Sequence, residues 1–314
     1  MTDFSPFTLS SPTGADLAVR HMPSQGPARG IVQINHGLAE HAARYARFAR
    51  FLAARGYEVY AHDHRGHGAT RAPGSIPGAF AAKDGASKVI ADVAAVHAVI
   101  AERHPGLPVV TLGHSMGGLL ALNFAEAHPG ASAALAVWNS NFNAGIAGRA
   151  GQAILAVEAF FKGSDTPSAM LPKLTFQAWA KAMPDRRTDF DWLSRDQAEV
   201  DLYIADPLCG WDATVSLWRD VFELIYAGGR VENLAKLPHA LPVHLIGGAQ
   251  DPATDKGEAV RWIEARMRKA GLTDVTLQIL PETRHETLNE INREQSMANF
   301  AVWLDTVLPA AARP

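Results

Sequence analysis

Ser115 is the residue whose surroundings point most directly to chemistry. It lies at the centre of the run Gly-His-Ser-Met-Gly at residues 113–117, which has the Gly-x-Ser-x-Gly spacing of a nucleophilic serine. An apolar run at 109–112 precedes it, and a segment rich in small and apolar residues, 116–127, follows it. This order of strand, sharp turn and helix exposes the hydroxyl and directs a helix N-terminus at a developing oxyanion, which an ordinary serine-containing turn does not do. We therefore predict that Ser115 attacks an ester or similar acyl bond.

A serine of this kind needs an acid and a histidine base later in the chain, in that order. Asp251 follows the apolar run 243–247 in a short loop, at the type of strand end where the active sites of parallel sheets gather. Asp255 is the neighbouring rival, and its position suits an N-cap of the next helix better. We predict that Asp251 is the acid.

The base must lie beyond Asp251, and only one histidine does. His285 lies in the loop before the last predicted helix, whereas His244 lies inside a predicted strand, where a structural role is expected. We predict that His285 takes the proton of Ser115 and passes it to the leaving group, while Asp251 orients the imidazole ring.

Two backbone N–H groups are needed to hold the negative oxygen of the intermediate. Met116 directly follows the nucleophile and supplies the first. Leu38 follows Gly37 at the end of the predicted strand 30–35, and the glycine permits a close approach of the backbone. We predict that the N–H groups of Leu38 and Met116 form the oxyanion hole.

Four loops can meet in this way only if parallel strands carry them to one edge of a sheet. From residue 28 onward, short apolar runs alternate with segments of helical period, which is typical of repeated βα units. The chain is therefore of the α/β class. The predicted strands are 30–35, 58–62, 109–112, 133–138, 243–247 and 275–280, after a hairpin of 7–9 and 17–21; the predicted helices are 42–55, 85–103, 116–127, 256–270 and 293–308.

The alternation stops after Asn139, which predicts a change of architecture. Residues 143–220 hold four of the seven tryptophans and no strong strand pattern, so we expect an inserted helical lid there. The α/β core would then be discontinuous, formed by residues 1–142 and 221–314. The four lid tryptophans either line an acyl site or hold the lid helices together, and packing is the simpler expectation. They are Trp179, Trp192, Trp211 and Trp218.

Composition excludes several other classes of protein. Lys and Arg number 29 against 32 Asp and Glu, without a long run of one sign, so we expect no nucleic-acid partner. The single cysteine, Cys209, excludes an intrachain disulfide framework, and it has the setting of a small buried residue. No run approaches the roughly 20 apolar residues of a membrane span, and the polar start lacks a signal pattern, so a cytoplasmic location is expected.

Three histidines, His62, His64 and His67, are close enough in sequence to suggest metal ligation. Gly66 occupies the place where a di-metal signature would need another ligand. A hydrogen-bonded turn that packs beside the active site is the better interpretation. We predict no metal and no cofactor.

With these residues placed, the chain resembles the monoacylglycerol lipase and lysophospholipase group of α/β-hydrolases, which are serine aminopeptidase S33-like proteins. The resemblance implies a mostly parallel eight-stranded sheet flanked by helices, with a lid that shapes a tunnel for one acyl chain. It also implies that Arg44 and Tyr203 contact the head group or the lid, although residues 143–170 depart from the pattern. The motifs that carry the resemblance are residues 36–41, 44–45, 61–68, 113–118, 199–203, 206–208 and 284–286.

The resemblance implies a serine hydrolase that cleaves a single-chain lipid ester, a monoacylglycerol or a lysophospholipid, through an acyl-enzyme. The expected partners are this small acyl ester and water, with transient contact of the lid with a membrane surface. An aminopeptidase or amidase, or a broad short-chain esterase, would use the same three side chains. A binding module without catalysis is the alternative of another class, against which the full set of catalytic residues argues.

Overall fold

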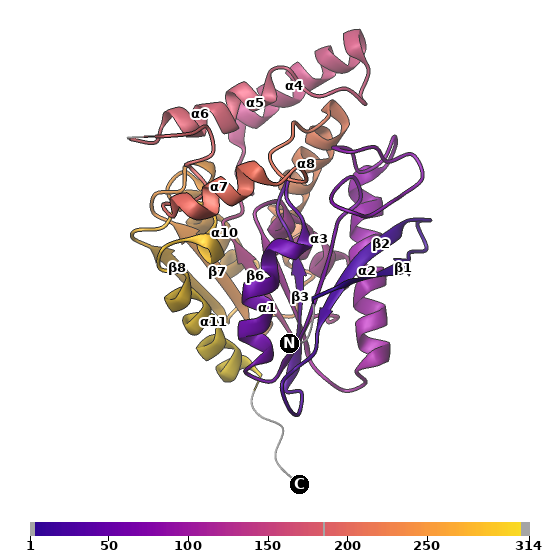
Figure 1. Ribbon diagram of the computed structural model, residues 1–314, viewed down its shortest axis with the longest axis vertical. Coiled ribbons are helices and arrows are strands. Elements are labelled where there is room, and N and C mark those ends of the chain that lie inside the picture. Colours follow the sequence, from indigo (N-terminus) through magenta and orange to yellow (C-terminus); the bar gives the residue numbers. More distant parts are fainter. Residues whose placement is uncertain (1–3, 185, 309–314) are drawn as a thin grey trace.

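The computed structural model describes residues 4–184 and 186–308, and its centre is an eight-stranded sheet with helices on both faces (Figure 1). Strands β1, β2 and β4 pair antiparallel, and every other neighbouring pair is parallel. The predicted fold class, a mostly parallel eight-stranded sheet flanked by helices, is confirmed. In spatial order the strands are β1 (Pro6–Ser10), β2 (Asp16–Met22), β4 (Tyr57–His62), β3 (Gly30–Asn35), β5 (Val109–His114), β6 (Ala134–Trp138), β7 (Val243–Gly248) and β8 (Val275–Leu280).

The helices follow the strands in the predicted alternation, with one long helical stretch between β6 and β7. The predicted helix at 42–55 divides into a 3-10 helix, η1, and α1. The described helices are η1 (Ala42–Tyr45), α1 (Ala46–Ala53), α2 (Gly85–Arg103), α3 (Met116–Ala127), α4 (Gly145–Lys162), α5 (Leu171–Leu174), α6 (Phe176–Lys181), α7 (Gln197–Ala205), α8 (Val215–Gly228), α9 (Val231–Leu234), η2 (Pro252–Thr254), α10 (Glu258–Lys269), η3 (Thr287–Asn289) and α11 (Arg293–Val307).

Apolar cores lie on both faces of the sheet. On one face, α1 and α11 pack over Trp138 of β6, whose ring centroid lies 6.0 Å from that of Phe48 and 5.0 Å from that of Phe300. The Trp138 indole donates to Nδ1 of His244 on β7 at 3.1 Å, so His244 belongs to this core. On the other face, α2, α3, α8 and α10 bury a second apolar cluster. Burial on both faces explains why the central strands read as continuous apolar runs.

The order of the strands reverses at β3, because β4 lies on one side of it and β5 on the other. Asn35 at the end of β3 pairs with Gly113 near the end of β5, so the loops after these two strands leave the sheet side by side. Such a reversal opens a crevice at the carboxyl edge of a parallel sheet. The loops that carry Leu38 and Ser115 are therefore placed together by topology.

Helices α4 to α7 lie over the carboxyl edge of the sheet, at the top of Figure 1. Helix α8 packs against both α3 of the core and α4 above it. The expected lid boundary at residue 220 falls inside α8, which runs without a break from 215 to 228. One helix thus joins the segment 143–220 to the core.

Candidate active site

Ser115 lies in a strained turn between β5 and α3. Its backbone has φ 55° and ψ −120°, a conformation that residues with a side chain rarely adopt. The flanking glycines are required by close packing, because a Cβ on Gly113 would lie 2.0 Å from the carbonyl oxygen of Gly117. A Cβ on Gly117 would lie equally close to the carbonyl oxygen of Asn35. The turn therefore depends on these glycines, and it presents the serine hydroxyl to a cavity above the sheet.

The structure brings Ser115, His285 and Asp251 into direct contact. His285 Nε2 lies 2.9 Å from Ser115 Oγ, and His285 Nδ1 lies 2.9 Å from Asp251 Oδ2. Asp251 follows β7 and His285 follows β8, so both come from loops at the same edge of the sheet as Ser115. Since a carboxylate can only accept, Nδ1 carries the proton and Nε2 is free to accept from the serine.

The charge of Asp251 is maintained although its carboxyl group is fully buried. Burial raises the pKa of this carboxyl. The charge and hydrogen bond of His285, with hydrogen bonds from Thr254 and Asn139, outweigh burial and hold the pKa below its ordinary value. Asp255, expected to cap α10, instead lies in the left-handed region after η2, and Gly257 occupies the N-cap position. That expectation was wrong because the connection between β7 and α10 contains the extra turn η2.

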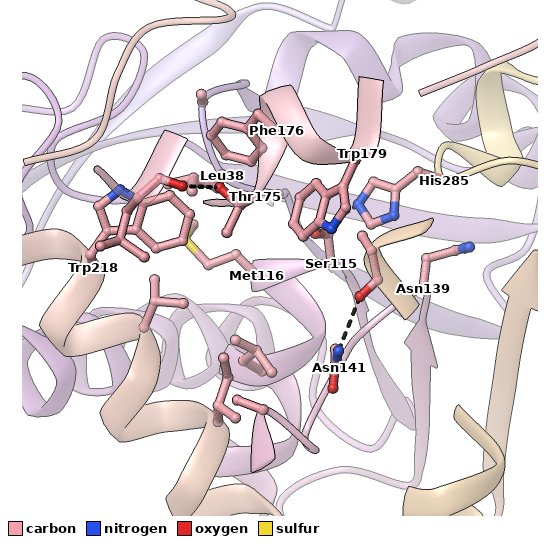
Figure 2. Close-up of a pocket in the computed structure, with 18 of the residues that line it drawn as sticks. Leu38, Ser115, Met116, Asn139, Asn141, Thr175, Phe176, Trp179, Trp218 and His285 are labelled. Atoms are coloured by element: carbon pink, nitrogen blue, oxygen red, sulfur yellow. Dashed lines mark hydrogen bonds between the residues drawn. The ribbon is translucent and has the colours of Figure 1, made fainter. Parts of the chain in front are cut away.

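Leu38 and Met116 line the cavity beside Ser115 (Figure 2). Among the residues that the structure describes, the backbone N–H groups of these two residues have no hydrogen-bond acceptor. Both groups are therefore available to an oxygen atom bound next to Ser115, as an oxyanion hole requires.

A buried ionic cluster fixes the loop that carries Leu38. Glu40 accepts from the Gly37 N–H at 2.5 Å, from Arg44 at 2.6 Å and from the Tyr45 hydroxyl at 2.9 Å. Arg44 also pairs with both carboxylate oxygens of Glu286, at 2.6 and 2.7 Å. Burial raises the pKa of Glu40, but Arg44 and His114 together hold that pKa well below its usual value. The cluster thus connects the Leu38 loop to the residue that follows His285.

Arg44 and Tyr203 lie in contact but face different spaces. The guanidinium carbon of Arg44 lies 4.8 Å from the centre of the Tyr203 ring. Tyr203 lines the cavity and donates to the Ala39 carbonyl at 2.9 Å. Arg44 lies behind it, with a side chain 12% exposed and engaged by Glu40 and Glu286. Its contacts in the structure are those of a residue that holds the loop in place.

The cavity above Ser115 has a volume of about 600 Å³ and a mostly apolar lining. Its floor includes Leu38 and Met116, and its walls come from α4, α5, α6 and α8. All four predicted lid tryptophans line it, and they also pack on their neighbours: the Phe176 ring stacks on Trp192 with centroids 5.8 Å apart. The same side chains therefore line the cavity and hold the lid together. A cavity of this size and lining suits a small apolar ligand.

Several polar residues of the site were not predicted. Asn139 and Thr254 donate to the Asp251 carboxylate, and Thr287 donates to Asn139. Glu40 and His114 lie beside the loop of Leu38. Asn139 carried one usable signal, because it directly follows a predicted strand, as the loops of Ser115, Asp251 and His285 do. The others are recognisable only once the chain is folded.

The histidines His62, His64 and His67 are buried beside the Leu38 loop. The rings of His64 and His67 pack with that of His36, and the ring of His62 packs on His64. His36 Nε2 accepts from the His64 backbone N–H at 3.0 Å. Burial lowers the pKa of His62 to about 4 and that of His67 to about 3, so these rings are neutral at pH 7. Burial also raises the pKa of the Cys209 thiol, which makes it a poor nucleophile.

Within residues 4–184 and 186–308, two groups of side chains lie close enough to share a metal ion. Neither contains Ser115, Asp251 or His285, and neither contains the three histidines considered in the sequence. The groups are His21 with Glu58 and His104, and His41 with Asp206 and Cys209.

Comparison with known proteins finds a matching family and similar lipases. Residues 26–292 match the family described as serine aminopeptidase, S33. The monoglyceride lipase of Homo sapiens is 29% identical over 297 residues, which cover 90% of this chain and 88% of the relative. The monoacylglycerol lipase of Mycolicibacterium smegmatis is 26% identical over 276 residues, which cover 88% of each chain. The resemblance inferred from the sequence motifs is confirmed.

Solved structures share the whole architecture. A thermostable carboxyl esterase from Bacillus coagulans, in complex with glycerol, superposes with a TM-score of 0.87 at 23% identity, covering 98% of this chain and 100% of the other. A soluble variant of the monoglyceride lipase from Saccharomyces cerevisiae, with a substrate analog, has a TM-score of 0.76 at 19% identity, covering 99% and 97%. The fold is therefore that of the α/β-hydrolases, as expected.

Proposed function

We propose that this chain, which belongs to the serine aminopeptidase S33 family, hydrolyses single-chain lipid esters. In this proposal Ser115 is the nucleophile, His285 the base and Asp251 the acid. The chain is an ester hydrolase, in keeping with its family and its lipase relatives. The observation that carries the proposal is the unbroken series of contacts from Asp251 through His285 to Ser115, which ends in an apolar cavity.

The reaction follows from these contacts. Ser115 Oγ attacks the ester carbonyl while His285 Nε2 accepts its proton, and Asp251 stabilises the imidazolium that forms. The Leu38 and Met116 N–H groups hold the oxyanion, and His285 then protonates the departing alcohol. Water, deprotonated by the same histidine, releases the fatty acid from Ser115 and restores the enzyme.

The cavity favours a single acyl chain with a neutral alcohol. Its apolar walls suit an alkyl chain, and two carboxylates, Glu40 and Glu286, line it near Ser115. Neither Arg nor Lys is among the described residues that line this cavity, since Arg44 lies behind it and pairs with both carboxylates. This end therefore lacks the donors that usually bind a phosphate, whereas a carboxylate can accept from a glycerol hydroxyl. We therefore place a monoacylglycerol first and a lysophospholipid second.

The helical segment 143–220 fits the role of a lid that meets lipid surfaces. On α4, Ile146, Phe160 and Phe161 are 89%, 83% and 76% exposed. Large apolar side chains that are so exposed to solvent favour contact with a membrane surface. Among the described residues, no helix is both long enough and apolar enough to cross a bilayer.

The test is a panel of esters and amides offered to the wild type and to Ser115→Ala. The panel contains monoacylglycerols and lysophosphatidylcholines of graded chain length, p-nitrophenyl butyrate and aminoacyl anilides. We expect the monoacylglycerols to give the highest kcat/KM, and Ser115→Ala to lose about 10⁴-fold or more in kcat with an unchanged Tm. A preference for the anilides would instead make the enzyme an aminopeptidase. Wild-type turnover by Ser115→Ala, or failure of a fluorophosphonate to label Ser115, would contradict the proposal.

A further inference from the structure

Asn139 lies between the loops that carry Asp251 and His285. It follows β6 directly, its backbone has φ 50°, and its side chain is almost fully buried. Its Nδ2 donates to Asp251 Oδ2 at 3.2 Å, and its Oδ1 accepts from the Thr287 hydroxyl at 2.8 Å. Figure 2 shows Asn139 at the same end of the cavity as Ser115 and His285. One amide therefore joins the acid to the chain segment that carries the base.

Thr287 and the carbonyl oxygen of Arg284 together fix which way this amide faces, because Asn139 Nδ2 also donates to that carbonyl at 3.5 Å. A hydroxyl that donates to the Asn139 carbonyl oxygen leaves the amide nitrogen directed at Asp251, where the carbonyl oxygen would meet a negative charge. Asp251 and Thr287 are both fully buried, so water cannot replace these contacts cheaply. Thr287 also lies two residues after His285, on the same loop. The base loop thus contacts Asp251 directly through His285 and indirectly through Thr287 and Asn139.

The two oxygens of Asp251 have different partners. Oδ1 accepts from the Ala253 N–H at 2.9 Å. Oδ2, the oxygen that faces His285, accepts also from Thr254 at 2.8 Å and from Asn139. The bonds from Thr254 and Asn139 approach from outside the imidazole and fix the rotation of the carboxylate about its Cα–Cβ and Cβ–Cγ bonds.

We propose that Asn139 and Thr287 are positioning residues that hold the Asp251 carboxylate toward His285. This inference rests on the proposed function, since it assigns a task within the triad of Ser115, His285 and Asp251. Thr287 acts only through Asn139, and neither residue touches the reacting atoms.

Isosteric variants separate positioning from folding. Thr287→Val removes the hydroxyl and keeps the shape, and it should lower kcat about three- to tenfold with KM unchanged, because Thr287 lies outside the cavity lining. Thr287→Ser should restore kcat. Thr111→Val is the matched control: Thr111 is also fully buried, and its hydroxyl bonds Ser132 at 2.7 Å. The kcat of Thr111→Val should equal that of the wild type.

Coupling between the two residues is the sharper measurement. Asn139→Ala should lower kcat about tenfold to a hundredfold, and the double variant with Thr287→Val should lose no more than Asn139→Ala alone, because Thr287 has nothing left to orient. Losses that multiply in the double variant would overturn the inference, as would a wild-type kcat in Thr287→Val.

The same variants are compared by their rate of labelling with a fluorophosphonate, which needs an activated Ser115 but no natural substrate. Slow labelling of Thr287→Val and Asn139→Ala, against a fast wild type, supports the inference even if every ester of the panel is a poor substrate. Equal labelling rates in all variants overturn it while leaving the proposed function intact.

Discussion

Glu40 is a single residue on which two parts of the site depend. Its carboxylate accepts from the Gly37 N–H beside the oxyanion loop and pairs with Arg44, which in turn holds Glu286 next to His285. It is 3% exposed. A buried carboxylate with so many donors fixes the positions of the groups that bond it, in addition to contributing its charge.

Glu40→Gln keeps the shape and one acceptor but removes the charge that pairs with Arg44. We expect the free energy of unfolding to fall by an amount on the order of 2 kcal/mol, and kcat/KM to fall about tenfold as the Leu38 loop loosens. Urea unfolding and ester kinetics measure the two effects. Glu258→Gln is the control, since Glu258 is 67% exposed and its pair with Arg261 is worth little. A stable Glu40→Gln with full activity would show that the cluster does not support the loop.

Among the elements, α4 differs most from the rest of the surface. It presents Phe160 and Phe161 to solvent, with ring centroids 5.1 Å apart. Neither lines the cavity, so their exposure is not explained by substrate contact within it.

Replacing both phenylalanines by serine should weaken binding to lipid surfaces. Each buried ring contributes about 1.5–3 kcal/mol, so KM for monoacylglycerol in phosphatidylcholine vesicles should rise at least about tenfold. The kcat/KM for p-nitrophenyl butyrate in solution should stay at the wild-type value. Val302→Ser on α11, at a position 64% exposed, is the control and should change neither. An unchanged vesicle KM in the double variant would exclude α4 as the contact surface.

The elements differ in how far the sequence could predict them. The buried parallel strands are continuous apolar runs, so the predicted strand 30–35 coincides with β3 and 243–247 differs from β7 by one residue. The helices of 143–220 could be placed only as a group, because their ends depend on contacts such as those of Trp192 with Phe176. The local sequence pattern determines the bounds of a strand that is buried between two layers of helices. The bounds of a short helix over a cavity depend instead on its tertiary contacts.

The same distinction holds for the site. Ser115, Asp251 and His285 follow predicted strands in a fixed order, and the structure brings them into contact. Asn139 could not be predicted in the same way, because its partners Asp251 and Thr287 lie 112 and 148 residues further along the chain. Glu40 bonds residues close in sequence, but its connection to the catalytic histidine depends on Arg44 and Glu286, which are 242 residues apart.

At the scale of the whole molecule, stability depends on a carboxyl group far from the catalytic chemistry. Glu126 on α3 is 5% exposed, and its Oε1 has no hydrogen-bond partner among the described residues. Burial raises its pKa to about 9, although Lys236 opposes the shift. The folded protein therefore keeps this proton where the unfolded chain has lost it, and stability should fall as pH rises from about 4.5 toward 9.

Glu126→Gln mimics the protonated carboxyl and should remove this dependence. We expect its Tm to match that of the wild type near pH 5 and to exceed it at pH 9. The corresponding gain in unfolding free energy at pH 9 should be on the order of 1–3 kcal/mol. Thermal unfolding at pH 5, 7 and 9 measures it, with the exposed Glu102→Gln as the control. A constant difference across this pH range would mean that Glu126 is not protonated in the folded state.

The left-handed backbone at Ser115 implies a conflict between durability and turnover. Selection for stability alone would put glycine at this position, since glycine adopts φ 55° without strain. A Ser115→Gly protein should therefore be inactive yet melt at a higher temperature than the wild type, because relief of about 1–3 kcal/mol of backbone strain exceeds the roughly 0.5–1 kcal/mol cost of the freer unfolded chain. Calorimetry measures the difference, and a lower melting temperature would contradict it. On this view, a serine there is retained for activity against the preference of the fold.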